Sequence, residues 1–469
     1  MVAPLVIEGV ENFSVILQNP VGVTLGTPAQ VTISISDLGR DIAGIPGLSA
    51  NQREVAAWFD TNCERLIASN PTNADQQDLA GICGNLRSVN TTDDQVRDAL
   101  DAINAEELAT AAITTLRLLG DQHGNLQRRL NGLRSGATGI DLSGLSVSVS
   151  GQQISGAALE EMLHGLTWGA VGGESDFGRW GFFVDGKVDF GDRDASEANN
   201  GYDFDSSTIT VGADYRVRDN FFLGGALGYA NADVDFAGGG GLDFDSYRGS
   251  LYSTFFLADS YYLDGLVSYG TTDYESDRRI SYTDSGGAID RTATGSTDGT
   301  IFTVGFGTGF DFNRGPLTFG PNLGVYYDDV DVDSYTESGA GGLNLNIGDQ
   351  DAKSLTVNAG GHASWVINTK WGVLIPNARI DWVHEFEDSV EEVGIRFAAD
   401  PFANDPTNPS APIIVRTEQP DENYFVWSVG ASAQFIRGFS GFVTYQATEG
   451  YNDLELNEVS FGMRYEKTF

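Results

Sequence analysis

The sequence predicts a mainly β protein whose second half closes into a twelve-stranded antiparallel transmembrane β-barrel. Two observations predict this fold. From Arg179 to the last residue, the chain consists of runs of about ten to fifteen residues in which apolar and polar side chains alternate. The connections between these runs are short and long in turn. Ahead of the barrel we expect a luminal α-helix, a helical region and the remnant of a β-sandwich.

Within the runs, one parity is apolar and the other is small or polar. Ile209, Val211 and Ala213, for example, alternate with threonine and glycine. A soluble sandwich shows the same alternation, but its strands are usually about five or six residues long. Runs of twice that length match tilted strands that cross a bilayer. We expect the strands at 179–191, 205–217, 221–234, 246–258, 261–273, 299–312, 317–329, 353–367, 371–386, 423–436, 439–448 and 456–469.

The connections support a barrel independently of the strands. Five links are tight, "RDN", "ADS", "NRGP", "NTK" and "IRG", and the links between them are long, polar and acidic, such as "GDRDASEANNGYD". Short turns on one side and long loops on the other are typical of outer-membrane barrels, where the short turns are periplasmic. An even number of strands places both ends of the barrel on that side. The apolar parity is therefore expected to face lipid.

Composition excludes some classes of protein. The 469 residues carry 27 basic and 66 acidic side chains, a net charge of −39, which argues against a nucleic-acid partner. No apolar run is long enough for a membrane-spanning helix. The opening "MVAPLVIEGV" lacks the charged start and apolar stretch of a signal peptide. The chain is therefore either soluble, or inserted as strands with its export signal outside this sequence.

Residues 105–469 resemble the autotransporter translocator domain. The resemblance is carried by "NLQRRLNGLRSG" (125–136), "RWGFFVDGKVDFGDRD" (179–194), "GYDFDSSTITVGADYRVRDN" (201–220), "LGGALGYANADVDF" (223–236), "HEFED" (384–388) and the terminal Phe469. It implies a barrel at 179–469 that inserts in the outer membrane of a Gram-negative bacterium, exports its N-terminal passenger and anchors it at the cell surface. The implied partners are outer-membrane lipid, the barrel assembly machinery, periplasmic chaperones and the passenger itself.

The end of the chain bears the expected assembly signal. In "EVSFGMRYEKTF" (458–469) the aromatic residues Phe461, Tyr465 and Phe469 share the apolar parity. Members of the family commonly place an aromatic two residues before the last, where this chain has Lys467. A lysine near the interface can extend its ammonium group toward water.

Residues 1–40 resemble the closing strands of a Calx-beta domain, a calcium-binding sandwich. The stretches "EGVENFSV", "NPVGVTLG" and "VTISISD" carry this resemblance, and 6–37 alternates as two or three strands. Glu8, Glu11 and Asp37 fall where that family places calcium ligands. Their alternative role is that of solvated carboxylates at strand ends. Calcium in this part of the chain is the only cofactor expected, and the passenger is expected to serve adhesion.

Residues 50–104 change to a helical pattern. The stretches "NQREVAAWFDTNCERLIAS", "NADQQDLAGICGNLRS" and "TDDQVRDALDAINAEELATAAITTLRLL" place apolar residues three and four apart and begin near Asn or Thr. Cys63 and Cys83 are the only cysteines. In an exported chain they are expected to form a disulfide, whereas in a cytosolic one they would be two buried thiols.

A luminal helix is expected within 105–178, from about Glu107 to Arg134. It is long enough, at 1.5 Å per residue, to span roughly 40 Å, and it is basic, with Arg117, Arg128, Arg129 and Arg134. The lumen parity of the strands is acidic, and its carboxylates are Asp185, Asp214, Asp264, Asp311, Asp381, Glu385 and Glu458. Opposite charges attract strongly in a confined lumen. The alternative is a solvated helix near the barrel mouth. The path of 137–178 is left open.

Signals of catalysis and metal binding are weak. His384 lies beside Glu385, and His362 shares a parity with Ser364, but no serine has a recognisable nucleophile motif. "GGGGLD" (238–243) is expected to be a flexible loop and "DDVDVD" (328–333) a solvated acidic one. We therefore expect no enzyme. The alternative to a translocator is a barrel enzyme or passive pore with a periplasmic N-terminal appendage.

Overall fold

The computed structural model describes most of the chain. The described residues are 11–16, 30–35, 39–120, 146–149, 152–155, 180–196, 200–258, 260–387, 389–417, 419–435, 439–452 and 454–465.

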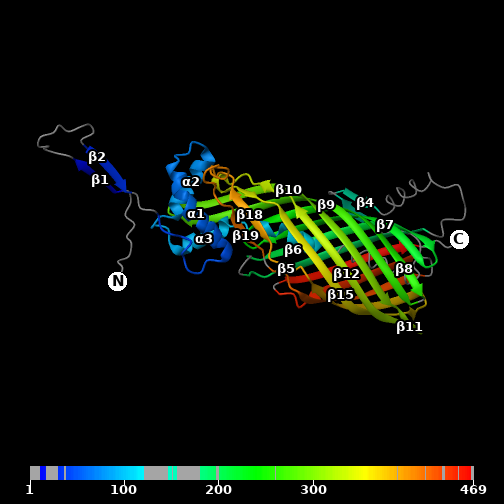
Figure 1. Ribbon diagram of the computed structural model, residues 1–469. Coiled ribbons are helices and arrows are strands. Elements are labelled where there is room, and N and C mark those ends of the chain that lie inside the picture. Colours follow the sequence, from blue (N-terminus) through cyan, green and yellow to red (C-terminus); the bar gives the residue numbers. More distant parts are fainter. Residues whose placement is uncertain are drawn as a thin grey trace, which may run out of the picture.

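Twelve antiparallel strands form a closed barrel (Figure 1). Each strand pairs with the next in sequence, and the last pairs with the first. The barrel strands are β5 (Trp180–Arg193), β6 (Tyr202–Arg218), β7 (Phe221–Phe236), β8 (Gly240–Ala258), β9 (Tyr261–Asp284), β10 (Gly287–Phe310), β12 (Leu317–Val332), β15 (Gln350–Trp365), β17 (Gly372–Glu385), β20 (Asn423–Phe435), β21 (Phe439–Glu449) and β22 (Leu454–Tyr465). Short strands β11 (Phe312–Arg314) and β16 (Ile367–Asn368) pair with β12 and β17 at the short-turn end.

The fold class is confirmed, and each expected strand lies on one barrel strand. Three expected loops are wrong. Residues 274–298 form the ends of β9 and β10 rather than a long loop, "GGGGLD" enters β8 at Gly240, and most of "DDVDVD" belongs to β12. Alternation continues through these stretches, but the apolar residues change to the other face. The expected strands were too short at the loop end because apolar residues were assumed to face outward along the whole strand.

The change of face is clear on β9. Leu263 and Tyr269 are exposed on the outer face of the strand, as expected for lipid contact. Farther along that face Asp273 is exposed, while Tyr274 and Ile280 are buried on the inner face. The outer face thus changes from apolar to acidic where the strand leaves the lipid, and the inner face becomes apolar. Above the membrane the barrel wall has the pattern of a soluble sheet that covers a core.

The long loops contain an additional sheet. Its strands follow the order β13 (Tyr335–Thr336), β14 (Leu345–Ile347), β18 (Glu392–Phe397) and β19 (Ile413–Arg416), with a 3₁₀ turn η3 (Gly341–Leu343) before β14. A bridge between Thr294 and Ser338 joins this outer sheet to β10. The outer sheet therefore continues the wall of the barrel beyond the membrane.

Residues 39–103 form a helical cap on the loop end of the barrel (Figure 1). It contains α1 (Ala50–Ala68), α2 (Ala74–Leu86) and α3 (Asp93–Ile103). Ser49 and Thr92 form capping boxes with glutamines three residues later, and the Asn73 side chain caps α2. The expected disulfide is confirmed, because Cys63 and Cys83 join α1 to α2.

The third helical stretch is interrupted between the helical region and the start of the expected luminal helix. The α3 helix ends at Ile103, where Asn104 adopts an extended backbone and its side chain accepts a hydrogen bond from the Glu106 amide. A 3₁₀ turn η1 (Leu108–Thr110) and helix α4 (Ala111–Gly120) follow. An asparagine that bonds the backbone two residues on competes with the helix, and this explains the break.

The cap and the barrel share one hydrophobic core. The α3 helix packs against β9, α2 against η3, and α1 against β19. Phe59 of α1 and Phe397 of β18 are both buried, with ring centroids 5.5 Å apart. The cap is therefore packed into the wall at the loop end of the barrel instead of standing apart from it.

Two hairpins of the described residues form small sheets of their own. Strands β1 (Glu11–Ile16) and β2 (Gln30–Ile35) pair antiparallel, in agreement with the strands expected at 6–37, and β3 (Ser146–Val149) pairs with β4 (Gln152–Ser155). Glu11 begins β1, while Glu8 and Asp37 lie outside the described residues. None of the helices that the structure describes is long and apolar enough to span a membrane.

Candidate functional site

The barrel lumen holds the expected carboxylates. Each lies on the strand face opposite the lipid-facing side chains. The buried ones are Asp185, Asp214, Asp381, Glu385 and Glu458, and the partly buried ones are Asp264 and Asp311. Of the basic residues expected opposite them, Arg117 lies in α4, whereas Arg128, Arg129 and Arg134 lie outside the described residues. The attraction between the two sets therefore stays a prediction.

One lumen cluster joins β5, β6, β21 and β22. The Lys187 ammonium, only 1 % exposed, lies 3.0 Å from Asp189 and 3.5 Å from Glu458. Ser206 donates a hydrogen bond to Asp189 (2.7 Å) and Gln446 donates one to Glu458 (3.2 Å). A buried charge is tolerated only when it is paired and hydrogen-bonded, so this network holds the strands where the barrel closes.

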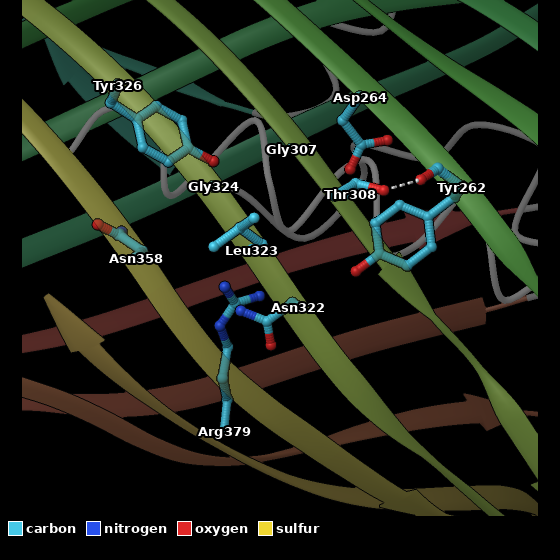
Figure 2. Close-up of a pocket in the computed structure, with 10 residues that line it drawn as sticks. All are labelled: Tyr262, Asp264, Gly307, Thr308, Asn322, Leu323, Gly324, Tyr326, Asn358 and Arg379. Atoms are coloured by element: carbon cyan, nitrogen blue, oxygen red, sulfur yellow. Dashed lines mark hydrogen bonds between the residues drawn. The ribbon is translucent and has the colours of Figure 1, made fainter.

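A second lumen cluster lies near the short-turn end, and two of its residues, Asn322 and Arg379, line a small cavity (Figure 2). Arg379 and Asn322 both donate hydrogen bonds to Asp381, and Figure 2 shows the two donors side by side. His362 lies 2.8 Å from Asp311. The cavity of about 20 Å³ is polar and has room for water but not for an organic substrate.

Helix α4 enters the lumen from the loop end. Its small buried residues Ala111, Ala112 and Thr115 allow it to approach the wall at β12 and β15. Gln350 of β15 donates to the Leu108 carbonyl (3.0 Å), and the Thr115 hydroxyl lies 2.8 Å from the Tyr274 hydroxyl. Around this helix the inner barrel face is apolar. We call these wall residues the apolar collar: Ala230, Ala232, Val234, Leu242, Phe244, Tyr274, Ile301, Val330, Val332 and Ala352.

Farther along α4, the Arg117 guanidinium lies 5.4 Å from the centre of the Tyr451 ring, in the link between β21 and β22. This is a cation–π distance. The described part of the chain thus runs from the cap into the barrel mouth at the apolar collar. The remainder of the expected luminal helix lies outside the described residues.

Arg278 of β9 fastens the cap to the barrel wall. Its guanidinium forms a bidentate ion pair with Glu337 (2.9 and 2.6 Å). It also donates hydrogen bonds to the carbonyls of Ala102 and Ile103 at the end of α3. The arginine and the glutamate are both buried. A cation at a helix C-terminus satisfies carbonyls that have no partner within the helix. The contact links barrel, outer sheet and cap in one place.

Asn51 links the cap to the edge of the outer sheet. Its side chain accepts a hydrogen bond from the Arg416 amide (2.9 Å) and donates one to the Arg416 carbonyl (3.0 Å). The side-chain amide thus pairs with β19 as a neighbouring strand would. It also lies 3.4 Å from the Glu106 carboxylate.

Two buried carboxyls lie where the cap meets the lumen. Burial raises the pKa of Glu106 and of Glu107 to about 7, although the Asn104 and Asn51 amides oppose the shift at Glu106. Sequence reasoning missed Arg278, Asn51 and Glu106 as site residues. The only local signal was Arg278, a charged residue on the inner parity between Ser276 and Ile280.

The comparison with known families decides what this barrel is. The autotransporter beta-domain model matches residues 182–446, more than half of the chain. The chain belongs to the autotransporter family. It is accordingly an outer-membrane translocator of a Gram-negative bacterium, which exports a passenger across that membrane.

Solved autotransporter structures are among those similar to this chain. The translocator domain of NalP from Neisseria meningitidis is 18% identical, with 66% of this chain and 95% of that chain covered and a TM-score of 0.48. The beta domain of the Bordetella autotransporter Brka is 17% identical, with 61% and 99% covered and a TM-score of 0.42. The transport unit of AIDA-I from Escherichia coli is 13% identical, with 66% and 98% covered and a TM-score of 0.37. A search of curated proteins finds no match.

The catalytic candidates lie apart in this autotransporter. His384 stacks on Trp382 and lies 3.0 Å from Asn423, whereas His362 lies against Asp311. Among the described residues, no group of three or more His, Cys, Asp or Glu side chains is placed to hold a metal ion. Of the expected assembly signal, Phe461 is exposed on the outer face and Tyr465 ends β22, while Phe469 lies outside the described residues.

Proposed function

We propose that this translocator anchors the chain upstream of residue 39 at the cell surface and acts in secretion and display without catalysis. The observation that supports the proposal is the path of the chain. Residues 39–103 pack on the long-loop end of the barrel, and α4 then enters the lumen from that end. Long loops of outer-membrane barrels are extracellular. The segment that precedes the cap is therefore expected to lie outside the cell.

The finer parts of the proposal concern partners and the passenger. The basic segment that follows α4 is held by the lumen carboxylates, because opposite charges attract strongly in a confined lumen. Assembly employs the barrel assembly machinery and periplasmic chaperones. The passenger ends in a Calx-beta domain that binds calcium through Glu8, Glu11 and Asp37 and serves adhesion. The resemblance of residues 1–40 supports this last part.

An epitope tag tests the orientation. A tag placed before Met1 should bind antibody on intact cells, and a tag inserted in the "NTK" turn at 368–370 should bind only after the outer membrane is permeabilised. Both proteins should give the same barrel band on a gel run without heating. If the N-terminal tag also requires permeabilisation, the N-terminal region is a periplasmic appendage and the anchoring proposal is wrong.

A further inference from the structure

We infer that the helical cap is a permanent outer gate, which closes the extracellular mouth of the barrel after export and stays with the barrel when the passenger is exposed to protease. This inference goes beyond the proposed function and rests on it only for the direction of export. It makes residues 39–469 one unit and places the end of the passenger before residue 39.

The first support is the apolar collar. Its side chains are at most 3 % exposed. Phe204 on β6 and Phe236 on β7, each 6 % exposed, extend the same apolar surface. Together these residues come from seven adjacent strands, β6 through β15. An empty barrel mouth would leave these apolar side chains in water. The cap, η1 and α4 cover them and join the same core, together with Leu454 and Leu456 of β22. Apolar surface on an inner wall has a structural reason only if it stays covered.

The second support is the polar contacts between cap and wall. Arg291 of β10 pairs with Asp78 of α2, and Asp78 also accepts a hydrogen bond from the Gly342 amide (2.8 Å). The Arg291 guanidinium beside it lowers the pKa of Asp78. Arg65 of α1 pairs with Asp405 and its guanidinium lies 3.7 Å from the centre of the Phe402 ring. With Arg278 and Asn51, these contacts join every cap helix to a different part of the wall.

The third support is the close approach of α2 to the turn η3. A Cβ atom on Gly342 would lie 2.5 Å from the Leu79 amide nitrogen and 2.7 Å from the Asp75 carbonyl oxygen. Backbone atoms on both sides leave room only for glycine. A cap that detached readily would not need such a fit, and any side chain at this position must push α2 away.

The experiment uses the full chain in outer membranes of intact cells. Gly342→Leu places a wedge between η3 and α2, whereas Gly84→Leu adds the same side chain to α2 where nothing lies within 4 Å. Trypsin reports on the cap because Arg53 on α1 is exposed but lies in a folded helix. Trypsin cuts after lysine or arginine, and residues 1–39 contain neither. For the natural chain and Gly84→Leu we therefore expect Arg53 to stay uncut and the barrel fragment to keep the cap. For Gly342→Leu, cleavage at Arg53 should be about tenfold faster or more.

A second measurement separates gate from lumen helix. In planar bilayers a cap that closes the mouth should give larger and more frequent currents for Gly342→Leu than for the natural chain and Gly84→Leu. Equally low currents in all three would assign the closure to the lumen helix and contradict the gate. If Gly342→Leu does not assemble, Asp78→Ala removes the Arg291 and Gly342 contacts without a wedge and should accelerate cleavage in the same direction. Equal cleavage of all variants, or rapid cleavage at Arg53 in the natural chain, would show that the cap is not a gate. Failure of the N-terminal tag to reach the surface would contradict export but not the gate.

Discussion

At the scale of single residues, the joint between cap and lumen depends on polar groups that have little contact with water. Asn51 completes the edge of the outer sheet and touches Glu106, whose other neighbour is the Asn104 amide. In addition to burial, the charge of Asp101 raises the pKa of Glu107, and the charge of Arg278 lowers it. A group in such a place is stable when neutral and hydrogen-bonded, and it is costly when charged. The state of these two carboxyls therefore sets how firmly the cap is held.

The stability of the cap should depend on these two carboxyls between pH 5 and pH 8. Their pKa of about 7 lies above the ordinary value of 4.5. A raised pKa means that the folded state binds more protons, so the contribution is complete below about pH 4.5 and is lost as the pH rises through 7. The loss is on the order of 3 kcal/mol for each carboxyl. Replacing both by glutamine should leave the cap unchanged at pH 5 and stabilise it at pH 8.

Hydrogen exchange of α1, corrected for the intrinsic effect of pH on exchange, measures this difference. Comparing the natural chain with the double glutamine variant at each pH removes the contribution of all other carboxylates. Equal protection of both proteins at pH 8 would show that Glu106 and Glu107 ionise without cost to the fold.

At the scale of elements, the cap is a small helical unit whose first two helices are joined covalently. The disulfide closes a loop of 20 residues between α1 and α2. In the chain-entropy model such a loop stabilises the folded state by about 3 kcal/mol. Cys63→Ser with Cys83→Ser should therefore increase the exchange of α1 and α2 amides by roughly a hundredfold, while β9 amides in the membrane stay protected. Adding reductant to the double variant should change nothing further. Two free thiols in unreduced peptides by mass spectrometry would contradict the prediction.

The elements show what sequence alone can predict. Strand number, lipid-facing parity and helix starts follow from local patterns. Ser49 and Thr92 mark helix starts, and Leu263 belongs to the lipid-facing parity of its strand. The docking of the cap does not, because its contacts join distant positions. Arg278 and Glu337 are 59 residues apart, and Asn51 and Arg416 are 365 apart. Alternation predicts which side of a strand a residue occupies. It does not predict whether the inner side covers water, a helix or a cap.

At the scale of the whole molecule, the change of face means that the outer surface of the barrel meets lipid in one part and water in the other. In the lower part, apolar side chains face lipid, and in the upper part, acidic side chains face water over an apolar interior. Many of these outer carboxylates lie directly opposite one another on neighbouring strands, which forms a carboxylate ladder around the rim. Its pairs are Glu455 with Asp192, Asp192 with Asp203, Asp203 with Asp235, Asp205 with Asp233, Asp233 with Asp243, Asp243 with Glu275, Asp245 with Asp273, Asp273 with Asp298, and Asp331 with Asp351.

The carboxylate ladder should make the extracellular wall more stable in salt. Like charges directly opposite on paired strands destabilise a sheet. The distance over which charges act falls from about 30 Å at 0.01 M salt to about 3 Å at 1 M, so added salt weakens the repulsion. Asp203, Asp233 and Asp273 each lie between two other carboxylates. Replacing these three by asparagine should raise the midpoint of urea unfolding in lipid vesicles at low salt and flatten its dependence on sodium chloride.

The control removes the same charge without touching the ladder. Glu64, Asp98 and Asp219 are exposed acidic residues on α1, α3 and a short turn, and replacing them by the corresponding amides lowers the total charge of −39 by the same amount. If repulsion acts through the whole charge of the molecule, both triple variants will shift the midpoint equally. If it acts through the pairs, only the ladder variant will lose its salt dependence, because screened charges farther apart than about 10 Å contribute little at 0.1 M. Equal shifts would therefore overturn the assignment of the salt effect to the strand register.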